Sequence, residues 1–207
     1  VDMMKVKHEA YLNIARKEIY KIFQLLEETF GDFLDESLSE NEEKLKAVEE
    51  VINPEEKFKL LSRLVDSTKL VIKAFGEKTK WKWSFVEFHG RLAIIAKNML
   101  NFKKMQEEND PRAQFFIIRN SMLRKIKELL ENGAHKYRDK YELSTRERND
   151  MEKACNFLRA LRRIHLLFGE TVDATNVKKG IDIWKAKAEA DAKAKEEELK
   201  KKKLVGK

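Results

Sequence analysis

Residues 110–133 read DPRAQFFIIRNSMLRKIKELLENG, and the fold prediction starts from this stretch. Asp110 can cap a helix with its side-chain oxygen, and Pro111 suits the first helical position, where no N–H is needed. Gly133 offers the left-handed residue with which many helices end. Between these signals, apolar residues recur every three or four positions, at Phe115, Ile118, Met122, Ile126 and Leu129. The stretch therefore predicts an amphipathic helix over 111–132 with a broad buried face.

Similar signals recur along the chain and predict further helices over 4–30, 40–52, 54–75, 85–109 and 145–168, three of which are followed by the stop signals Gly31, Gly76 and Gly169. Asn53 and Pro54 repeat the cap-then-proline pattern. Three serines each precede a glutamate by three residues, which is the capping-box pattern: Ser39, Ser84 and Ser144. Only 7 Gly and 2 Pro occur in 207 residues, too few for a turn-rich β fold. We therefore predict an all-α protein, a bundle of five to six long, mostly antiparallel amphipathic helices.

The predicted bundle spans 1–175, with an acidic N-terminal part at 1–76 and a basic C-terminal part at 84–169. Residues 176–207 contain 11 Lys and few apolar residues, which predicts a Lys-rich tail that is helical or partly disordered. Seven apolar residues are expected to form the core around the central helix and the helix at 145–168: Phe115, Ile118, Met122, Ile126, Phe157, Leu158 and Leu161.

The net charge of +8 is unevenly distributed. Residues 1–111 contain 19 Lys/Arg and 21 Asp/Glu, whereas residues 112–168 contain 14 and 7, and residues 169–207 contain 11 and 8. This asymmetry indicates binding to a polyanion or to a protein partner with an acidic surface. It also fits internal pairing, in which the basic half neutralises the acidic segment 27–56.

The sequence contains no recognisable catalytic or metal-binding motif. The four histidines are scattered, the only cysteine is Cys155, and no phosphate-binding or dinucleotide-binding glycine loop occurs. We therefore expect a protein that is not an enzyme and that has neither cofactor nor metal. No apolar run approaches the roughly 18 residues of a membrane span. The N-terminal residues lack an apolar signal-peptide core, so we expect an intracellular location, cytoplasmic or nucleoid/nuclear.

The most unusual cluster in composition is Lys78, Lys80, Trp81, Lys82 and Trp83. Lysines can neutralise phosphates while indole rings stack on exposed bases. The same residues could instead lie at a membrane interface, or the tryptophans could cap the end of the bundle while the lysines face water. Nucleic-acid contact at Lys80–Trp83 is one of these three interpretations.

A second candidate surface is rich in arginine, whose guanidinium group forms bidentate hydrogen bonds with phosphate or carboxylate. Its members lie on the central helix and on the helix at 145–168: Arg119, Arg124, Lys127, Arg146, Arg148, Arg159, Arg162 and Arg163. The competing interpretation is that these residues pair with the acidic segment 27–56.

Two functions follow from these patterns. The first is a non-enzymatic, nucleic-acid-associated accessory protein, with DNA and RNA both open. The alternative is a structural or adaptor subunit of a larger assembly, for example of a phage or virus, that makes contacts through its oppositely charged halves. The sequence leaves the oligomeric state open.

Overall fold

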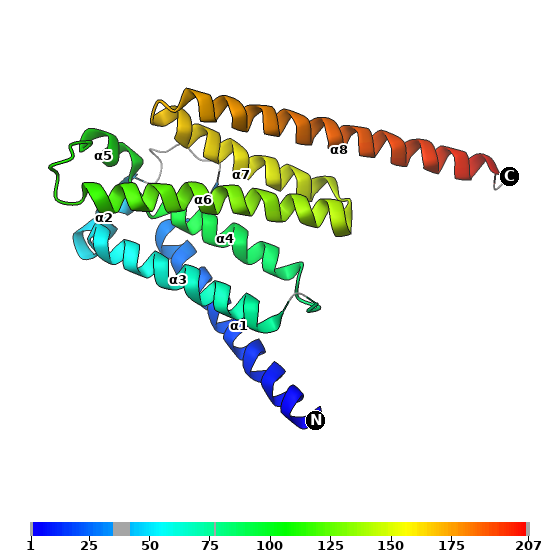
Figure 1. The fold of residues 1–207 in the computed structure, drawn as a ribbon, viewed down its shortest axis with the longest axis horizontal. Coiled ribbons are helices and arrows are strands. Elements are labelled where there is room, and N and C mark those ends of the chain that lie inside the picture. Colours follow the sequence, from blue (N-terminus) through cyan, green and yellow to red (C-terminus); the bar gives the residue numbers. More distant parts are fainter. Residues whose placement is uncertain (1, 35–41, 77, 206–207) are drawn as a thin grey trace. The chain divides into compact units, whose positions relative to one another are not determined.

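The computed structural model describes residues 2–34, 42–76 and 78–205, with side chains for 8–34, 45–76 and 78–201. These ranges form eight α-helices, one π-helical turn and no strand (Figure 1). The elements are α1 (Asp2–Phe30), α2 (Glu42–Val51), α3 (Pro54–Phe75), α4 (Ser84–Asn98), α5 (Phe102–Glu107), α6 (Phe116–Lys140), η1 (Tyr141–Thr145), α7 (Arg148–Leu167) and α8 (Thr171–Val205). The all-α prediction is confirmed for the described residues. The finer prediction of five to six long antiparallel helices in one bundle is not confirmed.

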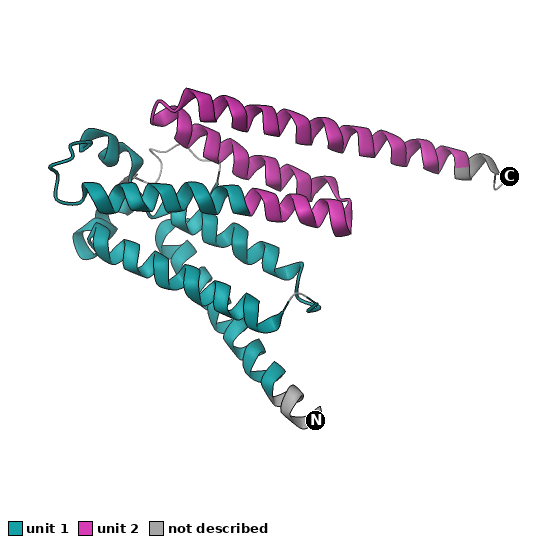
Figure 2. Ribbon diagram, in the orientation of Figure 1, with its two compact units in different colours: residues 1–132 teal, residues 133–207 magenta. Residues whose placement is uncertain are grey.

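The chain divides into two compact units, residues 1–132 and residues 133–207, which we call unit 1 and unit 2 (Figure 2). The division falls within α6. The sequence places its domain limit at 175 instead, but α8 packs along α7 from its first turns, and Ala174, Ile181 and Trp184 are buried. None of the described helices is both long and apolar enough to cross a membrane.

In unit 1, α1, α3 and α4 pack against one another around a core of aromatic side chains. Phe23 of α1 meets Phe88 of α4 edge to face, with ring centroids 5.3 Å apart, and Phe85 joins them at 5.6 Å from Phe88. This geometry is the favoured one for aromatic pairs. Met122 and Ile126 of α6 are fully buried, as predicted, whereas Phe115 and Ile118 are only half-buried.

In unit 2, α7 and α8 run side by side as a helical hairpin (Figure 1). The predicted core residues Phe157, Leu158 and Leu161 are buried on α7. Phe157 stacks on Tyr137 from the end of α6, with ring centroids 5.6 Å apart. Trp184 of α8 is buried, and the ring of His135 meets it edge to face, with ring centroids 5.4 Å apart.

The helix predicted over 85–109 is interrupted. Helix α4 ends at Asn98, whose side-chain amide donates hydrogen bonds to the backbone oxygens of Gly31 and Phe33. Asn101 then caps the short helix α5, because its side-chain oxygen accepts the Lys104 N–H at 3.0 Å. The prediction was wrong because an asparagine cap inside an apolar pattern restarts the helix, and periodicity alone does not reveal the break.

The central helix differs at both of its predicted ends. Asp110 accepts the Arg112 N–H at 2.9 Å, but this bond closes a turn, and α6 begins only at Phe116. At the other end, α6 continues through Gly133 to Lys140. Tyr137 extends the buried face beyond Gly133, so there is no reason for the helix to end there.

The remaining caps have mixed outcomes. Asn53 and Glu56 form a complete capping box at the start of α3, so the predicted start at Pro54 is confirmed. The boxes predicted at Ser84 and Ser144 do not form, because Ser84 is already helical and residues 141–145 form η1 instead of a helix start. Ser39 lies outside the described residues.

Candidate nucleic-acid interface

The arginines of α7 are positioned by the helix's buried face. Met151, Leu158 and Leu161 are buried, which turns the opposite side of the helix outward. Arg148 and Arg159 lie eleven residues, about three turns, apart on a side of α7 that borders the buried face, and both line the same groove. The structure therefore brings together two of the predicted contact residues.

This groove runs along α7 and α8 of unit 2 and has a volume of about 470 Å³. Four cationic side chains line it, two from each helix: Arg148, Arg159, Lys185 and Lys193. Three carboxylates, Glu152, Glu189 and Glu196, alternate with them, and the apolar lining comes from Met151, Cys155, Ala188 and Ala192. The groove is an open, mixed-charge channel with a small excess of positive charge.

Lys185 and Lys193 lie in the predicted Lys-rich tail at 176–207 and were not among the predicted contact residues. The apolar pattern of α8 offered a signal for Lys185, because Ile181 and Trp184 mark the buried side of this helix. Residues one position beyond a buried helical position flank that side, so Lys185 could have been placed at the α7 contact. The predicted tail is helical over its described residues as far as Val205.

Cys155 at the floor of this groove is buried. Burial is the main cause that raises the pKa of its thiol, although the positive charges of Arg159 and Lys185 act in the opposite direction. A thiol with a raised pKa stays protonated near neutral pH and is a poor nucleophile. The groove therefore offers binding chemistry and no activated cysteine.

Arg146 has a structural task. It is the C-cap of η1 and adopts a left-handed conformation with φ of 51°. Its guanidinium group donates to Asp191 of α8 at 3.2 Å, and the same carboxylate accepts the Tyr141 hydroxyl at 2.8 Å. Arg146 thus takes part in the hydrogen-bonded contact between η1 and α8, although its side chain remains 56% exposed.

The other predicted basic residues are distributed over two helices. On α7, Arg162 and Arg163 are half-buried, and Arg159 donates to Asn156. On α6, Arg124 is exposed and donates to Ser121 at 3.4 Å, whereas Lys127 is half-buried. The groove is not lined by Arg124, Lys127, Arg162 or Arg163, so the predicted arginine surface is only partly assembled there.

The Lys/Trp cluster packs against α1 within unit 1. The guanidinium carbon of Arg16 lies 4.0 Å from the centre of the Trp81 ring, and Lys80 forms an ion pair with Glu9 at 3.0 Å. Trp81 is half-buried. Lys82 lies over the ring of Trp83, with its nitrogen 4.9 Å from the ring centre. One ring face of each tryptophan is therefore already in contact with a cation of this chain.

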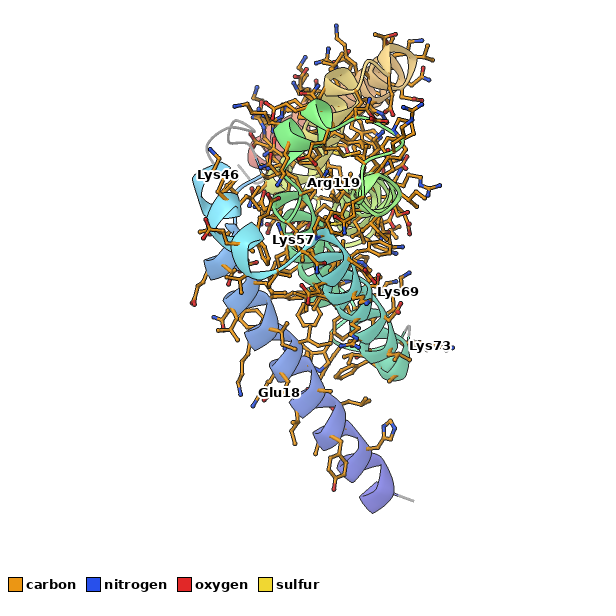
Figure 3. All side chains as sticks on the ribbon, turned by 90° about the vertical axis from the view of Figure 1, so that its left-hand side faces the viewer. Glu18, Lys46, Lys57, Lys69, Lys73 and Arg119 are labelled. Carbon is orange, nitrogen blue, oxygen red and sulfur yellow. The ribbon has the colours of Figure 1, made fainter. Side chains whose placement is uncertain are left out.

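Arg119 is not a surface residue. It is 7% exposed and forms an ion pair with Glu108. A second buried cation, Lys57, lies near it on α3 (Figure 3). Lys57 contacts Glu49 of α2 at 3.5 Å, and Lys104 contacts the same carboxylate at 3.0 Å. Burial lowers the pKa of Lys57, and the Glu49 charge opposes that shift. These cations are engaged inside unit 1 and do not belong to an outer contact surface.

One group of side chains could offer metal ligands, at the turn between α7 and α8. Atoms of His165, Glu170 and Asp173 lie within 4.8 Å of one another. However, His165 Nδ1 and Glu170 already share a hydrogen bond of 2.5 Å. Both acids also lie at or beside the N-terminus of α8, where negative charge is stabilised without any ion. We therefore assign no metal to this group.

The chain belongs to the TP0443 family, whose model matches residues 1–192. No curated protein matches the chain, and no solved structure matches it either.

Proposed function

We propose that this protein is a non-enzymatic, nucleic-acid-associated accessory protein that contacts the phosphate backbone through the α7–α8 hairpin. The observation that carries the proposal is the location of the charge. Unit 2 contains 20 Lys/Arg and 13 Asp/Glu, a net of +7, whereas unit 1 contains 24 and 23, a net of +1. Nearly all of the excess positive charge therefore belongs to one small helical unit, and a polyanion is the partner that such a unit attracts.

Within the hairpin, Arg148 and Arg159 are the residues best placed for phosphate. Both line the open groove, and the half-buried stem of Arg159 restricts its motion before any contact is made. A side chain that is already restricted loses less conformational entropy on binding. The carboxylates of the same groove weaken its field, which favours modest, strongly salt-dependent and sequence-independent binding.

The Lys/Trp cluster contributes less in this proposal than its composition indicates. Arg16 already stacks on Trp81, and Lys80 is already paired with Glu9. A base could stack on that face of Trp81 only by displacing Arg16. We therefore expect the hairpin of unit 2, and not Lys80–Trp83, to dominate contact with nucleic acid.

The test is a fluorescence-anisotropy titration of single-stranded DNA, duplex DNA and RNA at several salt concentrations. Reversing the groove arginines with Arg148→Glu and Arg159→Glu should weaken binding at low salt by about tenfold or more. The matched control reverses two exposed cations of unit 1, Arg63→Glu and Lys69→Glu, and changes the net charge equally. This control should reduce affinity by no more than about twofold.

Two outcomes would contradict the proposal. The first is a parent protein that binds none of the three probes at low salt. The second is an equal loss of binding in both double variants, because binding would then follow net charge alone and would not locate a contact surface on the hairpin.

A second function, a structural or adaptor subunit of a larger assembly, is favoured by a different observation. Large apolar side chains remain exposed as neighbours on α1, including Tyr11 at 72% and Ile14 at 55%, three residues apart. Contiguous exposed apolar residues are typical of protein contacts. Purification after nuclease treatment in high salt separates the two functions, because a salt-insensitive assembly of large mass would support the subunit and not the nucleic-acid proposal.

A further inference from the structure

Helix α1 has two apolar faces, of which only one is used inside unit 1. Ile19, Phe23 and Phe30 are buried against the rest of that unit. Four large apolar side chains on another side of the helix remain exposed, and we call them the outer stripe: Tyr11 at 72%, Ile14 at 55%, Ile22 at 41% and Leu25 at 62%. A helix that packs on one side only has no reason to carry a second apolar face.

The spacing of the outer stripe places its members on one line along the helix. Steps of three and eleven residues return to nearly the same side of an α-helix, which has about 3.6 residues per turn. Tyr11 and Ile22 are eleven residues apart, as are Ile14 and Leu25. The stripe therefore extends over about four turns, with Glu18 between its two apolar halves.

The stripe is also symmetric about Glu18. Ile14 and Ile22 lie four residues to either side of Glu18, and Tyr11 and Leu25 lie seven residues to either side. Figure 3 shows Glu18 on α1 on the side away from α3, and its side chain is 55% exposed. A pattern that reads the same in both directions along a helix fits an antiparallel copy of itself.

We infer that the outer stripe is a homodimer contact, in which α1 of a second copy packs antiparallel with the two-fold axis at Glu18. This inference does not depend on nucleic-acid binding, and it assigns one interface to the subunit alternative. In that register Ile14 meets Ile22 of the second copy and Tyr11 meets Leu25 of the second copy, in both directions. Such a contact is isologous and closes at two chains.

The charges at the centre fit the same register. Glu18 and Lys21 of one chain now pair at 2.8 Å, and both are more than half exposed. In the antiparallel pair, Lys21 of the second copy lies three residues from Glu18 along the helix axis, a distance of about 4.5 Å. Each Glu18 can then pair with Lys21 of the opposite chain, which offsets the repulsion between the two central glutamates.

The size of the contact sets the expected strength. Eight partly exposed side chains in the pair give roughly 1,000 Å² of buried surface, the lower end for a specific interface. The dimer should therefore be weak and should form as protein concentration rises. Sedimentation equilibrium from micromolar to near-millimolar protein, after nuclease treatment and in high salt, should show a monomer–dimer equilibrium.

Two variants test the surface. Ile14→Asp with Leu25→Asp should leave a monomer throughout the concentration range, because charge is then placed against the apolar stripe of the second copy. The matched control is Leu70→Asp, an exposed leucine on α3 of the same unit, which should leave the dimer unchanged. Circular dichroism confirms that each variant keeps its helix content.

Cysteine crosslinking tests the register. Glu18→Cys places a thiol at the two-fold axis and should form a disulfide-linked dimer under mild oxidation. Tyr11→Cys places the two thiols about 21 Å apart along the axis and should not. The parent chain controls for Cys155, which is buried.

A parent that stays monomeric at near-millimolar concentration would overturn the inference, and so would a dimer that survives the double aspartate variant. Crosslinking of Tyr11→Cys without crosslinking of Glu18→Cys would exclude this register and with it the inference. None of these results bears on the nucleic-acid proposal, whose readout is binding of the anisotropy probes by unit 2.

Discussion

At the scale of single residues, the hydroxyl of Tyr141 shows how unit 2 is held together. It donates to Asp191 of α8 at 2.8 Å, and Arg146 donates to the same carboxylate. Burial raises the pKa of Tyr141 to about 12, and the hydrogen bond to Asp191 adds to this shift. The bond in turn lowers the pKa of Asp191. One buried phenol thus connects η1 to the middle of α8.

This raised pKa predicts a loss of stability at high pH. In the unfolded chain Tyr141 ionises near pH 10, whereas in the folded protein it keeps its proton up to about pH 12. Its contribution is therefore complete below about pH 10 and is lost as the pH rises towards 12. Tyr141→Phe should lower the free energy of unfolding by about 1 kcal/mol at pH 8 and should flatten the fall between pH 10 and 12.

Urea unfolding of the parent and Tyr141→Phe at a series of pH values measures both effects. The exposed Tyr11→Phe is the matched control and should follow the parent, at protein concentrations low enough to keep the chain monomeric. Parallel curves for the parent and Tyr141→Phe above pH 10 would show that Tyr141 does not titrate with a raised pKa.

At the scale of elements, α6 continues through a residue that is a local helix-stop signal, Gly133. Gly133 lies inside the helix, and a Cβ built on it would lie 3.4 Å from the nearest ring carbon of Phe157. That is an ordinary van der Waals distance, so the site has room for a methyl group. Gly169, in contrast, has φ of 72° and is followed by α8.

This contrast predicts opposite effects for two alanine substitutions. Gly133→Ala should raise the free energy of unfolding by about 0.5–1 kcal/mol, because alanine loses less conformational entropy in a helix. Gly169→Ala should lower it by about 1–2 kcal/mol, because alanine is strained in the left-handed conformation. Thermal unfolding followed by circular dichroism compares the two variants. A destabilised Gly133→Ala would mean that the Phe157 ring does not tolerate the added methyl group.

At the scale of the whole molecule, part of the positive charge of unit 2 lies beyond the hairpin groove, at the C-terminal end of the chain. Ile181 and Trp184 are buried, so α8 cannot be removed at its start without opening the core of unit 2. The groove lining reaches Glu196. Beyond that residue the chain contains 5 Lys and 2 Glu, a net of +3.

Truncation after Glu196 should therefore weaken nucleic-acid binding only in part. Removal of these lysines should cost the free protein little stability, and the groove arginines remain in place. The slope of log affinity against log salt should become shallower by about two to three units at most. The anisotropy titration measures this slope. Complete loss of binding after truncation, with unchanged helix content, would assign the contact to the end of α8 and not to the hairpin.

Local sequence signals were sufficient to predict the helical class and several helix limits. Asn53 with Pro54 and the glycines at 31, 76 and 169 act within one helical turn, and the structure has helix ends at each of them. The uneven charge was likewise visible from composition. What these signals could not supply is any information about residues that are distant in sequence.

Which basic residues face outward depends on how the helices pack together. Arg119 is buried in an ion pair with Glu108, and Trp81 is covered by Arg16 from α1. Lys185 joins Arg159 in one groove because α7 and α8 pack together. Within their own helices, Arg119, Arg159 and Lys185 have the sequence pattern of solvent-exposed residues. Burial and pairing depend on which other element covers them, and that is set by packing between helices far apart along the chain.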